Sequence, residues 1–111
     1  MKPEAIDFRV PDRTEKIRAV QNAMDVLNRK WTISILSSIF YYQSRRFMDL
    51  KKDIDGISNK QLSKELKILE SDNLVTRTMV GKHPWYELTE RGKLLEPIIE
   101  QLKEWGERVM F

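Results

Sequence analysis

The sequence contains no cysteine and only one histidine in 111 residues. Without cysteine there is no disulfide framework, no thiol nucleophile, no thiol redox sensor and no cysteine-based zinc site. A lone histidine, His83, cannot build a histidine-rich metal site. The glycine-rich phosphate loops and the G-x-S-x-G serine motif are also missing. These absences predict a protein that is not an enzyme and that holds no metal or other cofactor.

Long apolar runs and structure-breaking residues are scarce as well. The longest apolar stretch, around residues 31–42, is interrupted by serines and is too short to span a membrane. The first residues are charged and lack the apolar segment of a signal peptide, so a cytoplasmic location is expected. Four glycines and four prolines argue against low complexity, and 41% hydrophobic residues suffice for one folded domain.

The basic residues are unevenly distributed. Residues 29–93 hold thirteen basic and eight acidic side chains, a net charge of +5, whereas residues 94–111 carry −2. A basic central segment suits a phosphate-bearing partner, because neutralised phosphates release their counter-ions. A mixed surface with a modest local excess would give the same numbers, so charge alone does not decide between these interpretations.

The first half of the chain predicts an arm followed by three helices. Residues 1–14 are polar, contain two prolines and lack apolar periodicity, so they form an arm in front of a domain of residues 15–111. Thr14 is placed to cap a first helix that opens at Glu15. Apolar residues at helical spacing predict a second helix from about residues 29–31 to 42, and a third over residues 47–54.

The second half predicts a helix–turn–helix followed by a hairpin. Ser58 and Gln61 form the capping box of a helix over residues 58–72. A β-rich segment, a turn at residues 81–84 and a returning strand predict a hairpin over residues 74–88. The fold class is therefore mainly α-helical with a small β-hairpin, the layout of a winged helix–turn–helix. In that layout one helix enters the major groove of DNA.

Helix 58–72 has two chemically different faces. Leucines line one face; the other carries hydrogen-bond donors and no acid, with Glu65 and Glu70 at its margins. Such donors can meet the acceptors on base edges in the major groove. An ordinary solvated helix face has a similar composition, and the arginines near residue 45 would equally suit a soluble edge strand. The residues expected to contact DNA are Arg45, Arg46, Ser58, Asn59, Lys60, Ser63, Lys64, Lys67, Arg77, Lys82 and His83.

The last helix is expected to be capped at Thr89-Glu90 and to kink or restart at Pro97, which lacks a backbone N–H. Its apolar stripe is wider than a lone domain of this size needs, so part of it is predicted to face a partner chain. The tryptophans of the chain, far apart in sequence, are interpreted as core or interface anchors. The residues expected in a dimer interface are Ile17, Val20, Met24, Ile98, Ile99, Leu102, Trp105 and Val109.

Several short motifs, in order from residue 18 to residue 108, resemble one family. They are Asp25-Val26-Leu27, Lys30-Trp31-Thr32, Ile35-Leu36, Arg46-Phe47 with Leu50, Gly56-Ile57-Ser58-x-Lys60-x-Leu62-Ser63-x-x-Leu66-x-x-Leu69-Glu70, Leu74-Val75-x-Arg77, Tyr86-x-Leu88-Thr89-Glu90-x-Gly92, Pro97 and Trp105-Gly106. The joint pattern is similar to the HxlR-type branch of winged-helix bacterial transcription regulators, within the MarR-like group. The resemblance implies a homodimer, built from the first and last helices, on a pseudo-palindromic operator in double-stranded DNA.

The chain departs from the family pattern at two places. The family often carries Gly-Gly before Lys-Trp, where this chain has Asn28-Arg29. Many members have Cys-Pro near the start of the first helix, where this chain has Arg18-Ala19, so thiol-based sensing is not carried over. The predicted function is a dimeric, sequence-specific DNA-binding transcription regulator of unknown effector. The alternatives are a winged-helix protein-interaction module that does not bind DNA, and a sensor enzyme fragment, for which no site residues are found.

Overall fold

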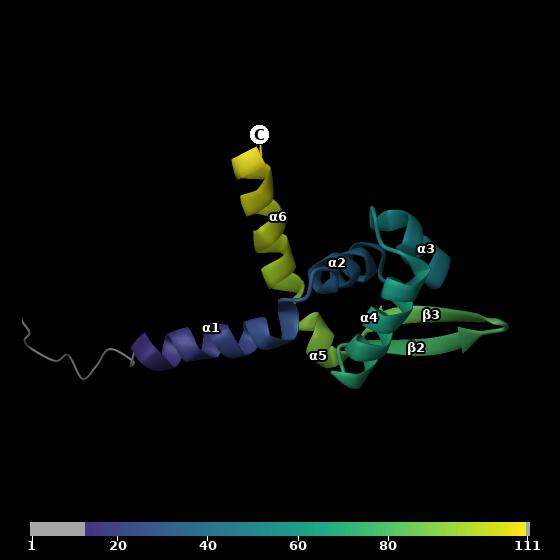
Figure 1. The fold of residues 1–111 in the computed structure, drawn as a ribbon, viewed down its shortest axis with the longest axis horizontal. Helices are drawn as coiled ribbons and strands as arrows, with labels where there is room; N and C mark the ends of the chain where they lie inside the picture. The colour runs from purple at the N-terminus through teal and green to yellow at the C-terminus, as the bar shows by residue number, and fades with distance from the viewer. Residues whose placement is uncertain (1–12, 111) are drawn as a thin grey trace, which may run out of the picture.

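The computed structural model describes residues 13–110, which form six helices and a three-stranded sheet. Figure 1 shows a small central body from which two helices and a hairpin project. Helix α1 (Arg13–Leu27) extends to one side, the hairpin of β2 (Val75–Val80) and β3 (His83–Leu88) extends to the other, and α6 (Glu96–Met110) rises between them. The radius of gyration is 17.8 Å, against about 13 Å for a compact chain of this length. The elements, in chain order, are α1 (Arg13–Leu27), α2 (Thr32–Tyr42), β1 (Arg45–Arg46), α3 (Phe47–Asp53), α4 (Asn59–Ser71), β2 (Val75–Val80), β3 (His83–Leu88), α5 (Glu90–Lys93) and α6 (Glu96–Met110).

The core forms where α2, α3 and α4 meet the base of the hairpin. Helix α2 lies at its centre, as its broad apolar stripe predicts, because Ile35, Leu36 and Ile39 are completely buried. The leucine face of α4 packs against them, and α3 adds Leu50. Burial of these side chains is the main favourable contribution to folding.

The sheet is antiparallel with strand order β1-β3-β2, so the short strand beside α3 lies at one edge. The predicted turn over residues 81–84 is wrong at its second half, because His83 pairs with Val80 and β3 begins there. Only Gly81 and Lys82 form the turn. Gly81 has a φ of 63°, which the first position of a type II′ hairpin turn requires and which glycine adopts without strain.

The ends of the helices follow local signals with one exception. Ser58 caps α4 as predicted: its Oγ accepts a hydrogen bond from the backbone N–H of Gln61 at 3.0 Å. The prediction that Pro97 restarts the last helix is confirmed, because a separate turn, α5, precedes α6 and Pro97 lies in the first turn of α6. Thr14 is not an N-cap, because α1 already begins at Arg13. Residues 1–12 of the predicted arm lie outside the described part of the chain.

Candidate nucleic-acid interface

The donor face of α4 is a continuous exposed surface. Lys60, Ser63, Lys64 and Lys67 line a shallow groove together with Ile68, and the three lysines are exposed. They lie three or four residues apart, so they share one side of the helix. The opposite side is held by Leu62, Leu66 and Leu69, all buried. The core thus fixes the direction in which the donors point.

The N-terminus of α4 is stabilised by a reciprocal cap. The Ser58 N–H donates to Gln61 Oε1 at 2.9 Å, while the Ser58 Oγ accepts from the Gln61 N–H. The Ser58 hydroxyl is therefore already engaged as an acceptor within the protein. Asn59 follows it in the first turn and is exposed, so its amide is free to reach a ligand beside the helix.

The prediction that Glu65 lies at the margin of the donor face is wrong, because this residue lies inside the protein. It is 7% exposed, and its Oε1 accepts a hydrogen bond from Arg29 Nε at 2.9 Å. The helical spacing of the sequence indicates this side, because Glu65 stands three residues after Leu62 and four before Leu69, on the buried side of α4. With this carboxylate turned inward, the groove carries no acid.

The two arginines of β1 differ in how they are bound. Arg45 is engaged within the protein: its Nη2 lies 2.7 Å from Asp53 Oδ2, and its guanidinium lies 3.8 Å from the centre of the Tyr42 ring. Its side chain is only 19% exposed, against 50% for Arg46. The geometry therefore supports a structural role for Arg45 and leaves Arg46 as the β1 arginine that can reach a ligand.

Arg46 also fixes the start of α3. Its backbone N–H donates to Asp49 Oδ2 at 3.0 Å, and its Nε lies 3.3 Å from the same oxygen. The backbone hydrogen bond, assisted by the two neighbouring guanidinium groups, holds the pKa of Asp49 below its usual value. A carboxylate at a helix N-terminus also favours the helix dipole.

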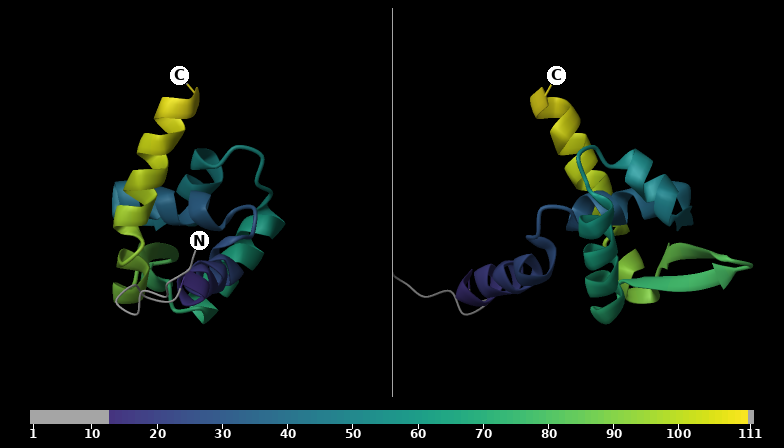
Figure 2. Two further views of the ribbon diagram at one scale, coloured as in Figure 1. Left: turned by 90° about the vertical axis from the view of Figure 1, so that its left-hand side faces the viewer. Right: turned by 45° about the vertical axis from the view of Figure 1, so that its right-hand side comes forward.

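The hairpin projects its basic residues into solvent. Lys82 occupies the turn, His83 pairs with Val80 beside it, and Arg77 pairs with Tyr86 nearer the core. All three basic side chains are exposed. The hairpin extends from the body beside α4 (Figures 1 and 2), so a ligand lying on the donor face can also meet the hairpin.

The interface residues predicted for pairing two chains fall into two groups. Ile99 is 3% exposed and packs in the core of its own chain, so its assignment to an interface is wrong. The others are exposed to about half of their surface or more, and they lie along α1 and α6: Ile17, Val20, Met24, Ile98, Leu102, Trp105 and Val109. Of the three tryptophans, Trp31 and Trp85 are half-buried, while Trp105 is 65% exposed.

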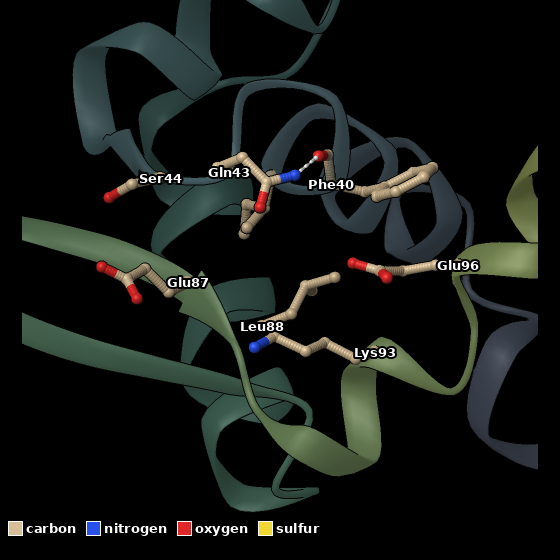
Figure 3. Close-up of a pocket in the computed structure, with 8 residues that line it drawn as sticks. Phe40, Gln43, Ser44, Glu87, Leu88, Lys93 and Glu96 are labelled. Atoms are coloured by element: carbon tan, nitrogen blue, oxygen red, sulfur yellow. Dashed lines mark hydrogen bonds between the residues drawn. The ribbon is translucent and has the colours of Figure 1, made fainter.

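A small cavity lies between α2, β3 and the start of α6 (Figure 3). It measures about 170 Å³, below the roughly 300–1,000 Å³ of typical small-molecule sites. Gln43 donates from Nε2 to the Phe40 carbonyl at 2.8 Å, and Lys93 and Glu96 line one side. Among residues 13–110, no three His, Asp or Glu side chains gather as a metal site would need. No helix in the same range is long and apolar enough to cross a membrane.

A capped helix with a donor face, preceded by a helix and turn and followed by a basic hairpin, defines the class of winged helix–turn–helix DNA-binding proteins. Residues 26–110 match the family model described as HxlR-like helix-turn-helix. The chain belongs to this family. It is a transcriptional regulator with a helix–turn–helix DNA-binding fold, and not an enzyme.

Similar proteins agree with this assignment. The HTH-type transcriptional regulator YybR of Bacillus subtilis, itself uncharacterised, is 35% identical over 94 residues, which cover 79% of this chain and 72% of YybR. A MarR-family regulator of Enterococcus faecalis superposes with a TM-score of 0.72 at 26% identity, covering 96% of this chain and 94% of that one. The redox regulator HypR in its reduced form gives a TM-score of 0.70 at 33% identity, covering 81% and 91%.

Proposed function

We propose that the protein is a dimeric, sequence-specific regulator that reads DNA with α4 in the major groove. The observation that carries this proposal is the groove formed by Lys60, Ser63, Lys64 and Lys67, which presents donors and no acid. Lysine can donate to the O6 and N7 acceptors of guanine, and asparagine and serine can serve other base edges. The donor face gives no support to a protein-interaction module, for which an acidic or apolar surface on α4 would be expected.

The hairpin and β1 supply contacts to the DNA backbone in this proposal. Arg46, Arg77, Lys82 and His83 are exposed and flank α4 from the sheet side. Contacts to phosphate fix orientation and register on the duplex and carry no sequence information directly. Arg45 is held by Asp53, so we assign it the role of orienting β1.

The exposed apolar faces of α1 and α6 support a homodimer. Helix α1 contains no buried residue, although Ile17, Val20 and Met24 recur on it at helical spacing. An isolated helix of 15 residues is marginal in water, so its apolar side requires cover. A second copy of the chain can cover this apolar side with its own α1 and α6. The resulting two-fold dimer would match a pseudo-palindromic operator.

The operator can be found directly by capturing genomic DNA fragments on the protein and sequencing them. Enrichment of fragments that share two inverted half-sites is expected, since each α4 of a two-fold dimer would read one half-site. Because the proposed operator is chromosomal DNA and relatives of the chain are bacterial, we expect the protein in the bacterial cytoplasm. Recovery of fragments without a common motif would contradict sequence-specific binding.

Substitutions of Lys64 and Lys82 should have different effects on DNA binding. Lys64→Ala removes a donor to a base edge, so it should cost roughly 1–3 kcal/mol on the preferred site and relax preference at one base pair. Lys82→Ala removes a phosphate contact at the hairpin turn. It should weaken all sequences about equally and lower the slope of log affinity against log salt by about one unit.

The measurement is affinity for the operator and for a scrambled duplex across a salt series. Identical profiles for the two variants would contradict the assignment of α4 as the reading helix. If neither substitution altered affinity, the protein-interaction module would become the better interpretation.

Thiol oxidants should leave DNA binding unchanged. HypR is described as a redox regulator, but this chain contains no cysteine, so the first step of cysteine oxidation is not available to it. Affinity for the operator with and without diamide, a thiol-directed reagent, tests this expectation. A loss of binding with diamide would contradict it. Peroxide requires a separate measurement, because five methionines can still be oxidised.

A further inference from the structure

Arg29 connects the junction between α1 and α2 to helix α4. Its guanidinium reaches a residue 36 positions away in sequence. Its Nε lies 2.9 Å from Glu65 Oε1, near the middle of α4, and its Nη2 lies 3.9 Å from Asp72 Oδ2 at the C-cap. One guanidinium thus lies near the carboxylates of two residues that stand about two turns apart along the helix.

The contact between Arg29 and Glu65 is largely removed from water. Glu65 is 7% exposed, and the Thr32 hydroxyl donates to the same Oε1 at 3.5 Å. The Nη2 atom of Arg29 is buried and has no hydrogen-bond partner. A buried carboxylate is costly without its counter-ion. Arg29 therefore cannot leave Glu65 without a penalty, and the two side chains hold each other in place.

Helix α1 has few other attachments to the body. None of its residues is buried, and only Val26 and Leu27, at its C-terminal end, pack against the core. The helix then projects away from the body in Figure 1 and in the right-hand view of Figure 2. The direction of α1 relative to α4 is consequently set at the junction where Arg29 lies.

We propose that Arg29 and Glu65 are positioning residues that fix the angle between α1 and α4. This inference rests on the proposed function, in which α1 helps to join two chains and α4 reads DNA. A fixed angle sets the distance between the two α4 helices of the dimer, and that distance must match the spacing of the half-sites. Arg29 and Glu65 thereby determine which half-site spacing is accepted, although neither faces the donor groove.

The distance between the two α4 helices can be measured without DNA. Because the chain has no cysteine, Ser71→Cys at the exposed end of α4 gives a single site for a spin label in the full-length protein. The distance distribution across the dimer should be narrow in this background and should broaden or shift when Arg29→Gln is added. Lys30→Gln is the matched control, because it removes a neighbouring charge that lies over Trp31 and does not reach α4.

Half-site spacing provides the second measurement. A duplex selected by the unsubstituted protein from a random library is altered by adding or removing one or two base pairs between its half-sites. Discrimination between the selected and altered spacings should fall by about fivefold or more in Arg29→Gln, the lower end for coupling between two sites. Lys30→Gln should keep the spacing discrimination of the unsubstituted protein. Exchanging the charges, with Arg29→Glu and Glu65→Arg together, should restore part of it.

The outcomes separate this inference from the proposed function. Circular dichroism shows whether Arg29→Gln is folded. If the folded variant keeps both the distance distribution and the spacing discrimination, this inference is overturned and the proposed function stands. If Arg29→Gln does not fold, Glu65→Met carries the same two tests, because methionine keeps the length of the side chain but removes the acceptor for Arg29. Unchanged values in that variant overturn the inference too. A monomeric unsubstituted protein, or one without spacing preference, would overturn the proposed function and this inference with it.

Discussion

Replacing Trp105 with glutamate should convert the protein to a monomer and weaken binding to a duplex with two half-sites by about 10²–10⁴-fold. Trp105 is 65% exposed and borders an apolar groove with Ile98 and Leu102. A charge placed there would be buried without a partner in the proposed interface, which is strongly unfavourable. Loss of the dimer also removes the gain in avidity that two linked reading helices provide.

Sedimentation at tens of micromolar, roughly the range in which a standard-size interface is populated, measures the first effect. Lys103→Gln is the matched control, because it changes the net charge by the same amount on the same helix. Lys103 makes only an exposed ion pair with Glu107 at 3.6 Å, so its loss should have little effect. A monomer in the unsubstituted protein, or a dimer that survives Trp105→Glu, would contradict the proposed interface.

Replacing Gly92 by alanine should lower the free energy of unfolding, whereas replacing Gly106 by alanine should raise it. A Cβ at Gly92 would clash with the Leu74 carbonyl oxygen and lie 3.4 Å from Leu88 Cβ. Backbone atoms cannot rotate away from such a contact, so the base of the hairpin must shift. Overpacking of this kind costs about 1–3 kcal/mol, occasionally more, and we expect Gly92→Ala at the top of that range.

Gly106 is the matched control because a Cβ there meets no atom within 4 Å in its own chain. Alanine in the middle of α6 should raise the free energy of unfolding by about 0.5–1 kcal/mol, since glycine loses more backbone entropy on folding. Urea unfolding followed by circular dichroism compares the two variants. A large loss of stability in Gly106→Ala would show that the partner helix approaches this position.

The sequence by itself determined the features that depend on near neighbours. The capping box of Ser58 and Gln61 is formed by atoms three residues apart, and the leucine stripe of α4 follows from helical periodicity. Pro97 restarts the last helix because proline has no backbone N–H to donate to the preceding turn of a helix. These effects act over one or two turns of chain, so the residues themselves encode them, and the winged helix–turn–helix follows from their order.

The tertiary structure decided what depends on residues far apart in sequence. Helical spacing places Glu65 on the leucine side of α4, but its partner Arg29 lies 36 residues away in sequence. Only the tertiary structure shows that this partner is present and that the carboxylate turns inward, which leaves the donor face without an acid. Arg45 is held by Asp53, and Ile99 packs in its own core, since contacts between elements choose one side of an amphipathic segment. Likewise, His83 belongs to β3 because pairing with Val80 extends the hairpin, and strand register is set by the partner strand.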